Sequence, residues 1–509
     1  MKAAKRHTRG LSLLSILTMV TVLVAGCADK QKESASGTAP NDAQQSLKLS
    51  IMATYYTPQP PNSQNEAWKK LQELTNSSID MTWVPRSAFD DKVSVSIASN
   101  DLPKVMLALK YNAAPLVNAI KSGVFWEIGP YLKDYKNLNA MNAIQFNSTK
   151  VEGKIYGLYR PRPISRHGII FRKDWLANVG LQEPKTPEEL YNVMKAFTLN
   201  DPDRNGKNDT LGMAEYKDIE AYLMPHMAAL FGAPNKWKEE GGKFTAEFMA
   251  KEYLDAMKFI KRLYDEKLMN QDFVVTEELQ RSTMFYQGKT GIVLGNADGV
   301  GSMQNEIRKN LPDAKVELMG NLTGPKGERN MAQQGYTGVY LFPKSSVKTE
   351  AELKRILAFF DRLLEADAVN LLAWGIEGKQ YKLTDGQVEK IVDADKFTSD
   401  VLGLDELRID DKARELPVKG EEEIVKKAKK VMQDNVKLAV LNPSLGLESE
   451  TLVQKGSDLN KIINDAKIKF ITGKLDEAGW SKAIEDWTKA GGDKVMAELA
   501  ASFTASKSK

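Results

Sequence analysis

Cysteine and histidine are almost absent from this sequence, and their scarcity excludes several kinds of chemistry. The 509 residues include one cysteine, Cys27, so no disulfide bond can form within the chain. Histidine occurs three times: His7 lies in an N-terminal segment that we expect to be removed, and His167 and His226 stand in unrelated sequence contexts. A histidine-based zinc site or catalytic triad therefore has almost no residues to draw on.

Common enzyme motifs are missing as well. The sequence holds neither the GxSxG pattern of hydrolases nor the GxxxxGKS/T pattern of nucleotide-binding loops. Residues 289–291 and 345–348 match the KTG and SxxK motifs of penicillin-binding enzymes, but in reversed order and without SDN. The paired carboxylates of a glycosidase remain open among 67 acidic residues. We therefore expect no enzyme, and keep a surface lipoprotein with glycan-hydrolysing activity as the alternative.

The mature chain also lacks an excess of positive charge. Residues 1–26 hold four of the 71 basic residues and none of the 67 acidic ones, so the remainder carries 67 of each. The pI of about 8.6 thus comes largely from the N-terminal segment. Nothing in this balance indicates nucleic acid or an anionic membrane surface as a partner.

That N-terminal segment is typical of a lipoprotein signal peptide. Four basic residues precede an apolar run over 11–24, which is shorter than the ~20 residues of a membrane-spanning helix. The run ends in Val24-Ala25-Gly26-Cys27, with small residues directly before the cysteine. We expect cleavage after residue 26, a lipid on Cys27, a flexible tether over 27–46 and an extracytoplasmic protein anchored to the bacterial cell membrane. An ordinary secretory signal with an incidental cysteine is the alternative.

The segment 201–209 has the spacing of a calcium loop. Asp201, Asp203, Asn205 and Asp209 place oxygen atoms at positions 1, 3, 5 and 9, with Gly206 at the sixth position, where an EF-hand loop turns. At position 7, Lys207 would contribute its backbone carbonyl. The twelfth position is Gly212, so the bidentate glutamate of an EF-hand is missing. The sequence favours helix, calcium loop and extended segment over an Asp/Asn-rich turn without metal.

The order of the other elements predicts an α/β protein. Apolar residues alternate over 47–53 and 79–83, as in strands, and a helix pattern lies between them. A third strand follows at 105–109 after another helix, which makes a βαβ arrangement. About 460 residues follow the tether, enough for two domains.

Several motifs together resemble family 1 extracellular solute-binding proteins, in particular the large lipoproteins that include alginate-oligosaccharide binders. The resemblance covers essentially all of 47–509. The motifs are Val24-Ala25-Gly26-Cys27, Asn100-Asp101-Leu102-Pro103, Phe171-Arg172-Lys173-Asp174-Trp175 with Gly180-Leu181, the loop 201–209, Phe285-Tyr286-Gln287-Gly288-Lys289, Trp374-Gly375-Ile376-Glu377-Gly378-Lys379-Gln380-Tyr381 and Ile471-Thr472-Gly473-Lys474.

The resemblance implies a periplasmic-binding-protein-like fold, in which two lobes are joined by a hinge and each is a mainly parallel sheet flanked by helices. We expect residues 47–163 and about 315–375 in the first lobe, and 164–314 and about 376–509 in the second. It also implies a monomer that binds an oligosaccharide between the lobes and delivers it to the permease of an ABC importer. Calcium would be structural, with Thr210 among its ligands at the place where relatives commonly supply a further glutamate, which predicts weaker binding.

A sugar site needs aromatic faces ringed by hydrogen-bonding groups. Trp374 and Glu377 are the first candidates, although Trp374 could equally be a core residue that ends a helix. Tyr55, Tyr56 and Asp101 are candidates because we place them at carboxyl ends of strands, where ligands of α/β sheets bind.

Weaker candidates are Trp126 and Tyr336. Arg160, Arg162 and Arg166 could attract a carboxylate or sulfate, or could be solvated charges of the hinge, which is the interpretation that we favour.

A peptide site needs paired charges for the termini, and a metal site gathers histidines, of which only His167 and His226 remain after cleavage. We expect an oligosaccharide ligand, for which Trp374, Tyr55 and Tyr56 supply stacking faces.

Overall fold

The computed structural model describes residues 45–57, 59–412 and 414–507. Cys27, the predicted signal peptide and nearly all of the predicted tether lie outside these residues. From residue 46 onward, the chain forms one compact unit by its internal contacts. Within the described residues, no helix combines the length and the apolar character needed to cross a membrane.

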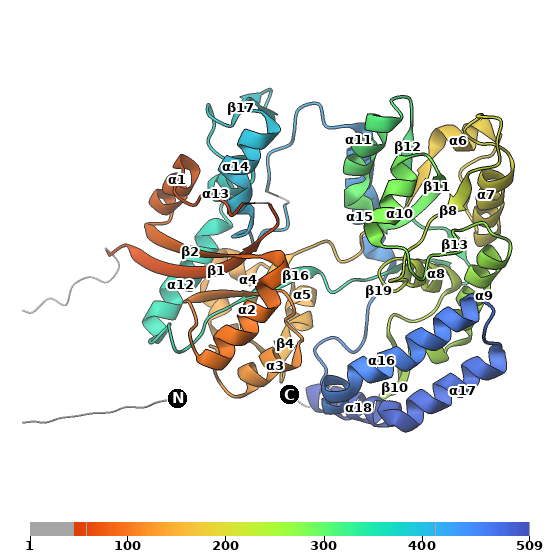
Figure 1. Cartoon of the computed structure of the whole chain (residues 1–509). Helices are drawn as coiled ribbons and strands as arrows, with labels where there is room; N and C mark the ends of the chain where they lie inside the picture. The colour runs from red at the N-terminus through yellow and green to blue at the C-terminus, as the bar shows by residue number, and fades with distance from the viewer. Residues whose placement is uncertain (1–44, 58, 413, 508–509) are drawn as a thin grey trace, which may run out of the picture. The chain divides into compact units, whose positions relative to one another are not determined.

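Two separate sheets organise this unit (Figure 1). The first sheet has the strand order β2-β1-β3-β16-β6. Its strands are β1 (Leu47–Tyr55), β2 (Ser77–Pro85), β3 (Val105–Ala108), β6 (Gly157–Pro161) and β16 (Tyr336–Leu341). β1 runs parallel to β2 and β3, whereas β16 runs antiparallel to β3 and β6. Residues 51–54 of β1 are all buried, as expected for a strand covered on both faces.

The second sheet has the order β12-β7-β11-β8. Its strands are β7 (His167–Arg172), β8 (Leu211–Met213), β11 (Thr290–Asn296) and β12 (Val316–Met319). β7 is antiparallel to both neighbours, and β8 is parallel to β11. Each sheet thus combines parallel and antiparallel neighbours. The predicted α/β class is confirmed, although two of the three strand pairs in the second sheet are antiparallel where we expected a mainly parallel sheet.

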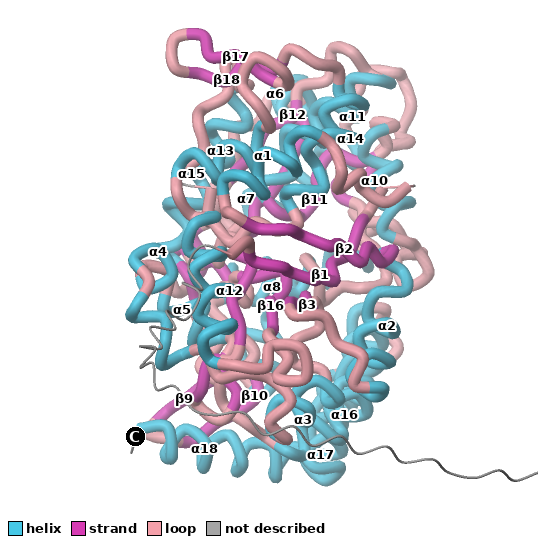
Figure 2. Tube along the Cα trace, turned by 90° about the vertical axis from the view of Figure 1, so that its left-hand side faces the viewer, coloured by secondary structure: helices cyan, strands magenta, loops and turns pink. Residues whose placement is uncertain are grey.

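Helices pack on both sheets, and Figure 2 shows α1, α2 and α12 around the strands of the first sheet. We call each sheet, with the helices and the apolar core that cover it, a lobe. The helices of the first lobe are α1 (Glu66–Leu74), α2 (Arg86–Ser99), α3 (Ala114–Lys121), α4 (Lys136–Asn139), α5 (Ala143–Ser148), α12 (Glu350–Leu363), α13 (Ala366–Trp374) and α14 (Ala394–Asp405). Those of the second lobe are α6 (Lys173–Asn178), α7 (Pro187–Leu199), α8 (Leu223–Phe231), α9 (Lys251–Asp265), α10 (Glu278–Tyr286), α11 (Val300–Asn310), α15 (Glu423–Asn435), α16 (Glu450–Ile471), α17 (Glu477–Trp487) and α18 (Asp493–Lys507). Small two-stranded elements are β4 (Lys150–Val151) with β5 (Lys154–Ile155), β9 (Trp237–Glu240) with β10 (Lys243–Ala246), β13 (Thr323–Gly324) with β14 (Gly327–Glu328), β15 (Asn330–Met331) with β19 (Ala439–Val440), and β17 (Tyr381–Thr384) with β18 (Gln387–Lys390).

The apolar cores follow the same division. One core surrounds the first sheet and includes buried residues from 47–159, 336–372 and 404–409. The other two lie on the second sheet, with residues from 169–331 and 428–499.

These cores correct the predicted lobe boundaries near 315 and 375. Residues 316–319 form β12, which pairs with β7 and so belongs to the second lobe. The chain returns to the first sheet only after residue 331. Residues 404–409 are buried in the first core, so the chain leaves that lobe after about 410 rather than 375. Strand pairing and apolar packing decide both boundaries, and neither leaves a clear trace in the local sequence.

Two of the segments that cross between the lobes bind each other. The amide of Arg162 donates to the carbonyl of Gly335 at 2.8 Å, and the amide of Gln333 donates to the carbonyl of Ile164 at 2.7 Å. The side chain of Gln145 donates to the carbonyls of both Arg162 and Gly335. Residues 162–166 and 332–335 therefore form a two-stranded hinge, which we call the crossing segments.

Candidate functional site

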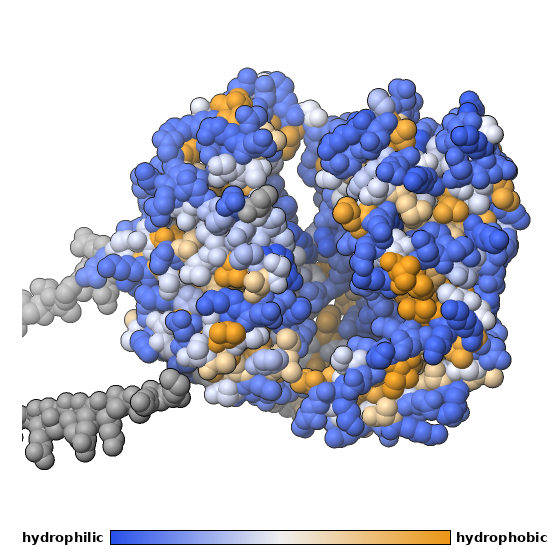
Figure 3. All heavy atoms as spheres, in the orientation of Figure 1, coloured by the Kyte–Doolittle hydropathy of each residue, from blue (hydrophilic) through white to orange (hydrophobic). Residues whose placement is uncertain are grey.

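In each sheet, one row of strand ends lies next to the crossing segments, and these ends make up the candidate site. In the first sheet, β1 ends at Tyr55, β6 ends at Pro161 and β16 begins opposite it at Tyr336, so all three lie at one edge. In the second sheet, His167 begins β7 opposite Asn296, the last residue of β11. Ligands of open α/β sheets bind beyond the carboxyl ends of strands. Figure 3 shows the surface hollowed between the two lobes.

Arg160 is neither the solvated hinge charge nor the free anion receptor that we considered. Its side chain is 7% exposed. One guanidinium nitrogen donates to the carboxylate of Glu406 at 2.7 Å, and another donates to the carbonyl of Asp405 at 2.9 Å. Arg160 is therefore a buried ion-pair partner that ties β6 to the residue after α14.

Arg162 and Tyr56 lie together at this edge. Tyr56 is 66% exposed, yet burial of its hydroxyl end and the charge of Glu406 raise its pKa, while Arg160 and Arg162 act in the opposite direction. The side chain of Arg162 is half-buried. Tyr336, at the same edge, differs from Tyr56, because Tyr336 is buried, and burial raises its pKa to about 12.

A polar network that the sequence analysis missed joins the second lobe to the hinge. Arg166 donates to Asp298 at 2.9 Å and to the side-chain carbonyl of Gln333 at 2.9 Å. The amide of Gln333 contacts the ring nitrogen Nε2 of His167 at 2.7 Å and donates to Asn296 at 3.1 Å. These residues come from three segments far apart in the chain. The one available signal was topological, because Asn296 and Asp298 stand at the carboxyl end of a strand.

A second polar group lies beyond β8 in the same lobe. Glu215 is fully buried, and burial raises its pKa to about 7 although Arg281 opposes the shift. The guanidinium carbon of Arg281 lies 4.8 Å from the ring of Tyr216 and 5.0 Å from that of Tyr222. Tyr222 is half-buried, and the charge of Arg166 lowers its pKa while that of Asp298 raises it. Its ring therefore borders the hinge network.

Trp374 and Glu377 lie beside the start of α1. Lys379, in the same turn, pairs with Glu66 at 2.6 Å, which places the turn beyond the carboxyl end of β1. Trp374 is half-buried, and its indole nitrogen has no hydrogen-bond partner. The ammonium of Lys390 lies 5.7 Å from its ring, and Glu377 is exposed. Their role in binding stays a prediction.

The placement predicted for Asp101 is wrong, and Trp126 lies on the same side. Asp101 precedes β3, which is parallel to β1, so it stands at the amino edge of the sheet, opposite Tyr55. Trp126 sits beside the end of β16 at that same edge, where its indole donates to the carbonyl of Val347 at 2.9 Å. The structure thus brings neither residue to the edge at which Tyr56 and Arg162 lie.

The loop 201–209 gathers oxygen atoms without closing them into a cluster. The carboxylate of Asp201 accepts from the amides of Asn205 and Gly206, both at 3.0 Å. The side-chain amide of Asn205 donates to Asp203 at 2.9 Å and to Asp209 at 3.1 Å. Across the described residues, no three acidic, histidine or cysteine side chains are arranged to hold a metal ion. One oxygen of Asp203 is nevertheless buried without a partner, and burial together with Asp201 raises its pKa.

Thr210 does not face this loop, which contradicts its predicted place among the metal ligands. Its side chain is buried and donates to the carbonyl of Phe197 in α7 at 2.7 Å. Thr210 therefore anchors the loop to the helix before it. Lys207 is exposed, as expected for a residue that would offer only its carbonyl.

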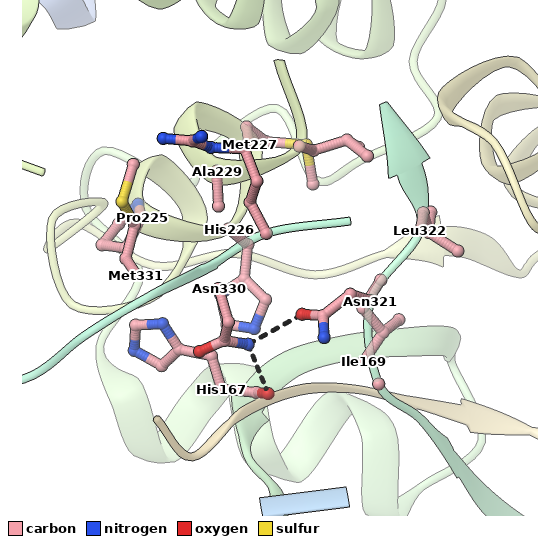
Figure 4. A pocket seen from close by; sticks show the side chains of 13 residues that line it. His167, Ile169, Pro225, His226, Met227, Ala229, Asn321, Leu322, Asn330 and Met331 are labelled. Atoms are coloured by element: carbon pink, nitrogen blue, oxygen red, sulfur yellow. Dashed lines mark hydrogen bonds between the residues drawn. The ribbon is translucent and has the colours of Figure 1, made fainter. Parts of the chain in front are cut away.

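The cavity beside His167 and His226 is too small for a sugar. It has a volume of about 20 Å³, roughly the space of one water molecule, and lies in the second lobe (Figure 4). Figure 4 shows Asn330 donating to Asn321 and to the carbonyl of His167. His226 stacks on His167 with ring centroids 4.6 Å apart, and burial lowers the pKa of His226 to about 4. This cavity is part of the packing behind the hinge.

Comparison with known proteins shows what the chain is similar to. The model of the family described as bacterial extracellular solute-binding protein matches residues 58–370. The polygalacturonan/rhamnogalacturonan-binding protein YtcQ of Bacillus subtilis (strain 168) is 40% identical over 504 residues, which cover 98% of this chain and 99% of that protein. Lipoprotein LipO of the same organism is 35% identical over 499 residues, which cover 96% and 98%. A solved structure of the alginate-binding protein AlgQ2 without calcium ion matches with a TM-score of 0.65 and 17% identity, over 91% of this chain and 98% of that chain.

Proposed function

The chain belongs to the bacterial extracellular solute-binding proteins, and from that premise we propose that it captures an oligosaccharide and delivers it to an ABC-type importer. The observation that carries the proposal is the 40% identity, over nearly the whole of both chains, to a protein named for binding polygalacturonan and rhamnogalacturonan. The site geometry agrees with this class of ligand. An exposed aromatic ring, Tyr56, stands among charged and amide groups at the edges where both sheets meet the crossing segments.

Capture would use both lobes. Tyr56 and Arg162 would contact the sugar from the first lobe, and Tyr222 and the Arg166 network from the second. Each sugar contact contributes little by itself, so several must act together in a hollow that excludes water. The crossing segments bind each other side by side, which suits a hinge that closes on a ligand.

We also propose that Cys27 carries a lipid that holds the protein at the outer face of the cell membrane. The sequence Val24-Ala25-Gly26-Cys27 and the 35% identity to a protein named lipoprotein both support this proposal. A tether over 27–46 would leave the lobes free to meet the permease.

A structural calcium ion is the third proposal. Asp201, Asp203, Asn205 and Asp209, with the carbonyl of Lys207, would hold it. The partnerless oxygen of Asp203 and its raised pKa support a cation here, because a positive charge would relieve the repulsion among the carboxylates. Asn205 would have to present its side-chain oxygen in place of its amide nitrogen.

A thermal-shift screen tests the main proposal. Purified protein is heated with neutral and acidic oligosaccharides, free amino acids and peptides, and a ligand must raise the melting temperature by mass action. We expect an oligosaccharide to give the largest shift. Steady release of new reducing ends from that oligosaccharide would instead support the glycan-hydrolysing alternative, and a shift with peptides alone would overturn the sugar assignment.

A further inference from the structure

Three arginines follow one another along β6 and the first crossing segment, and two of them are neutralised by contacts. Arg160 is paired with Glu406 at 2.7 Å. Arg166 is paired with Asp298 at 2.9 Å. The third, Arg162, makes no hydrogen bond or ion pair through its side chain to any residue that the structure describes. It is therefore the uncompensated cation of the hinge.

The backbone of Arg162 is held firmly although its guanidinium is not. Its amide donates to the carbonyl of Gly335 at 2.8 Å, and its carbonyl accepts from the side chain of Gln145 at 3.0 Å. Pro161 and Pro163 flank it and restrict the chain further. A receptor for a ligand gains from such a fixed base, because less conformational freedom is lost on binding.

The surroundings of Arg162 disfavour a bare positive charge. Burial is the largest cause that lowers the pKa of Arg162, and the nearby charges of Arg160 and Arg166 lower it further. The charges of Asp405 and Asp298 raise it. An arginine keeps its charge in proteins, so an anion or water must stabilise the positive charge of Arg162. A bound carboxylate would satisfy the guanidinium with two parallel hydrogen bonds.

We propose that the oligosaccharide is acidic and that Arg162 binds the carboxylate of one of its uronate units, while the exposed ring of Tyr56 packs on the apolar face of a sugar. The proposal rests on the proposed function and names its substrate class. A uronate offers both features that these side chains require, a planar carboxylate and a ring with apolar C–H groups. The neutralised Arg160 holds the hinge, and Arg166 contributes through its network with Asp298 and Gln333.

The experiment compares acidic oligosaccharides with their neutral esters by isothermal titration calorimetry on the protein from residue 27 onward. The probes are trigalacturonic acid and triuronates from alginate, each beside its methyl ester. We expect the acid to bind more tightly than the ester, and expect Arg162→Gln to weaken acid binding by at least about tenfold while leaving ester binding unchanged. Arg308→Gln, on the exposed surface of α11, removes the same charge and should leave all affinities unchanged.

Other outcomes distinguish a failure of this proposal from a failure of the proposed function. If Arg162→Gln binds the acids as the natural protein does, Arg162 is not the receptor. If a neutral oligosaccharide binds better than every acid, and binds both proteins equally, the acidic assignment is wrong while the proposed function stands. If no oligosaccharide of either kind binds, the proposed function itself is wrong. Equal melting temperatures of the two proteins exclude misfolding as the cause of any loss.

Discussion

Arg160 and Glu406 form a buried ion pair that spans 246 positions of the chain, with 2.7 Å between the guanidinium nitrogen and the carboxylate oxygen. Both side chains are nearly inaccessible to solvent, at 7% and 11% exposure. Burial of Glu406 raises its pKa, and Arg160 opposes that shift. The pair fixes the last residues of the first lobe before the chain leaves for the second.

Removing one partner of this pair should destabilise the fold strongly. Arg160→Met leaves the carboxylate of Glu406 buried without its cation, which costs about 3–5 kcal/mol in comparable pairs. Chemical denaturation monitored by tryptophan fluorescence measures the loss. Arg86→Met removes a half-exposed partner of Asp90 at 3.3 Å, and Asp90 keeps its second partner Lys110 at 3.1 Å, so this variant should cost only about 0–1 kcal/mol. Equal losses in the two variants would show that Arg160 contributes no more than a surface pair.

Calcium should stabilise the protein through the loop 201–209. We expect a chelator to lower the melting temperature, and expect added calcium to restore it in proportion to the logarithm of its concentration. Asp201→Asn with Asp203→Asn should give the lower melting temperature and no further response to chelator. A melting curve that ignores both treatments would make the loop an ordinary turn.

Thr210 supplies the matched control for the calcium experiment. Thr210→Val removes the hydrogen bond to Phe197 next to the loop, which should cost about 1 kcal/mol without changing the response to calcium. A lost calcium response in this variant would return Thr210 to the ligand set.

The fold was predictable from local patterns wherever one pattern covered a whole element. Alternation over 47–53 predicted β1. Residues 349–373 show a helical pattern of apolar residues, yet the helix is broken, because Glu365 adopts an extended backbone between α12 and α13. The side chain of Asn137 donates to Glu365 at 2.8 Å, and no local pattern could reveal this partner 228 positions away.

The site was predictable only in part, for a similar reason. Tyr56 and Arg162 carry chemistry that sugar binding requires, so their residue types alone made them candidates. Asp298, Gln333 and Glu406 gain their roles from partners in distant segments, and each looks like an ordinary polar residue in the sequence. Asp101 was misplaced because it lies between a helix and a strand, and only the parallel pairing of β1 and β3 shows which edge that is.

Glu215 should make stability depend on pH in the neutral range. Its pKa is raised from an ordinary value of 4.5 to about 7. The folded chain therefore holds this proton more tightly than the unfolded chain, so the stability that the group contributes is full at low pH and is lost as pH rises from 4.5 toward 7. The total is up to about 3 kcal/mol.

Glu215→Gln, melted at intervals from pH 5 to pH 8, isolates this effect. The melting temperature of the variant should gain on that of the natural protein as pH rises. Glu328→Gln, on an exposed turn, should show no such trend. A difference between Glu215→Gln and the natural protein that stays constant over this range would place the titration elsewhere.

Cys27→Ser should abolish lipid attachment while the lobes fold unchanged. Lipoprotein processing requires the thiol, and the chain has no second cysteine that could replace it. Labelling of cells with a fatty acid, followed by fractionation, should show the variant unlabelled and released from the membrane. A labelled variant would contradict the proposed anchor.

Trp374 should contribute to binding more than to stability. It ends α13 half-buried beside the start of α1, so part of its ring remains open to a sugar. Trp374→Ala should therefore weaken binding of the oligosaccharide that gives the largest thermal shift by about tenfold, since the loss of stacking and of buried apolar area together reaches about 1.4 kcal/mol. Trp126→Ala removes an equally large ring at the opposite edge of the sheet, where the indole already binds Val347, and should leave the affinity unchanged. Calorimetry on both variants decides the matter: if Trp374→Ala binds normally but melts several degrees lower, Trp374 is a core residue, and the ligand lies nearer to Tyr56 and Arg162.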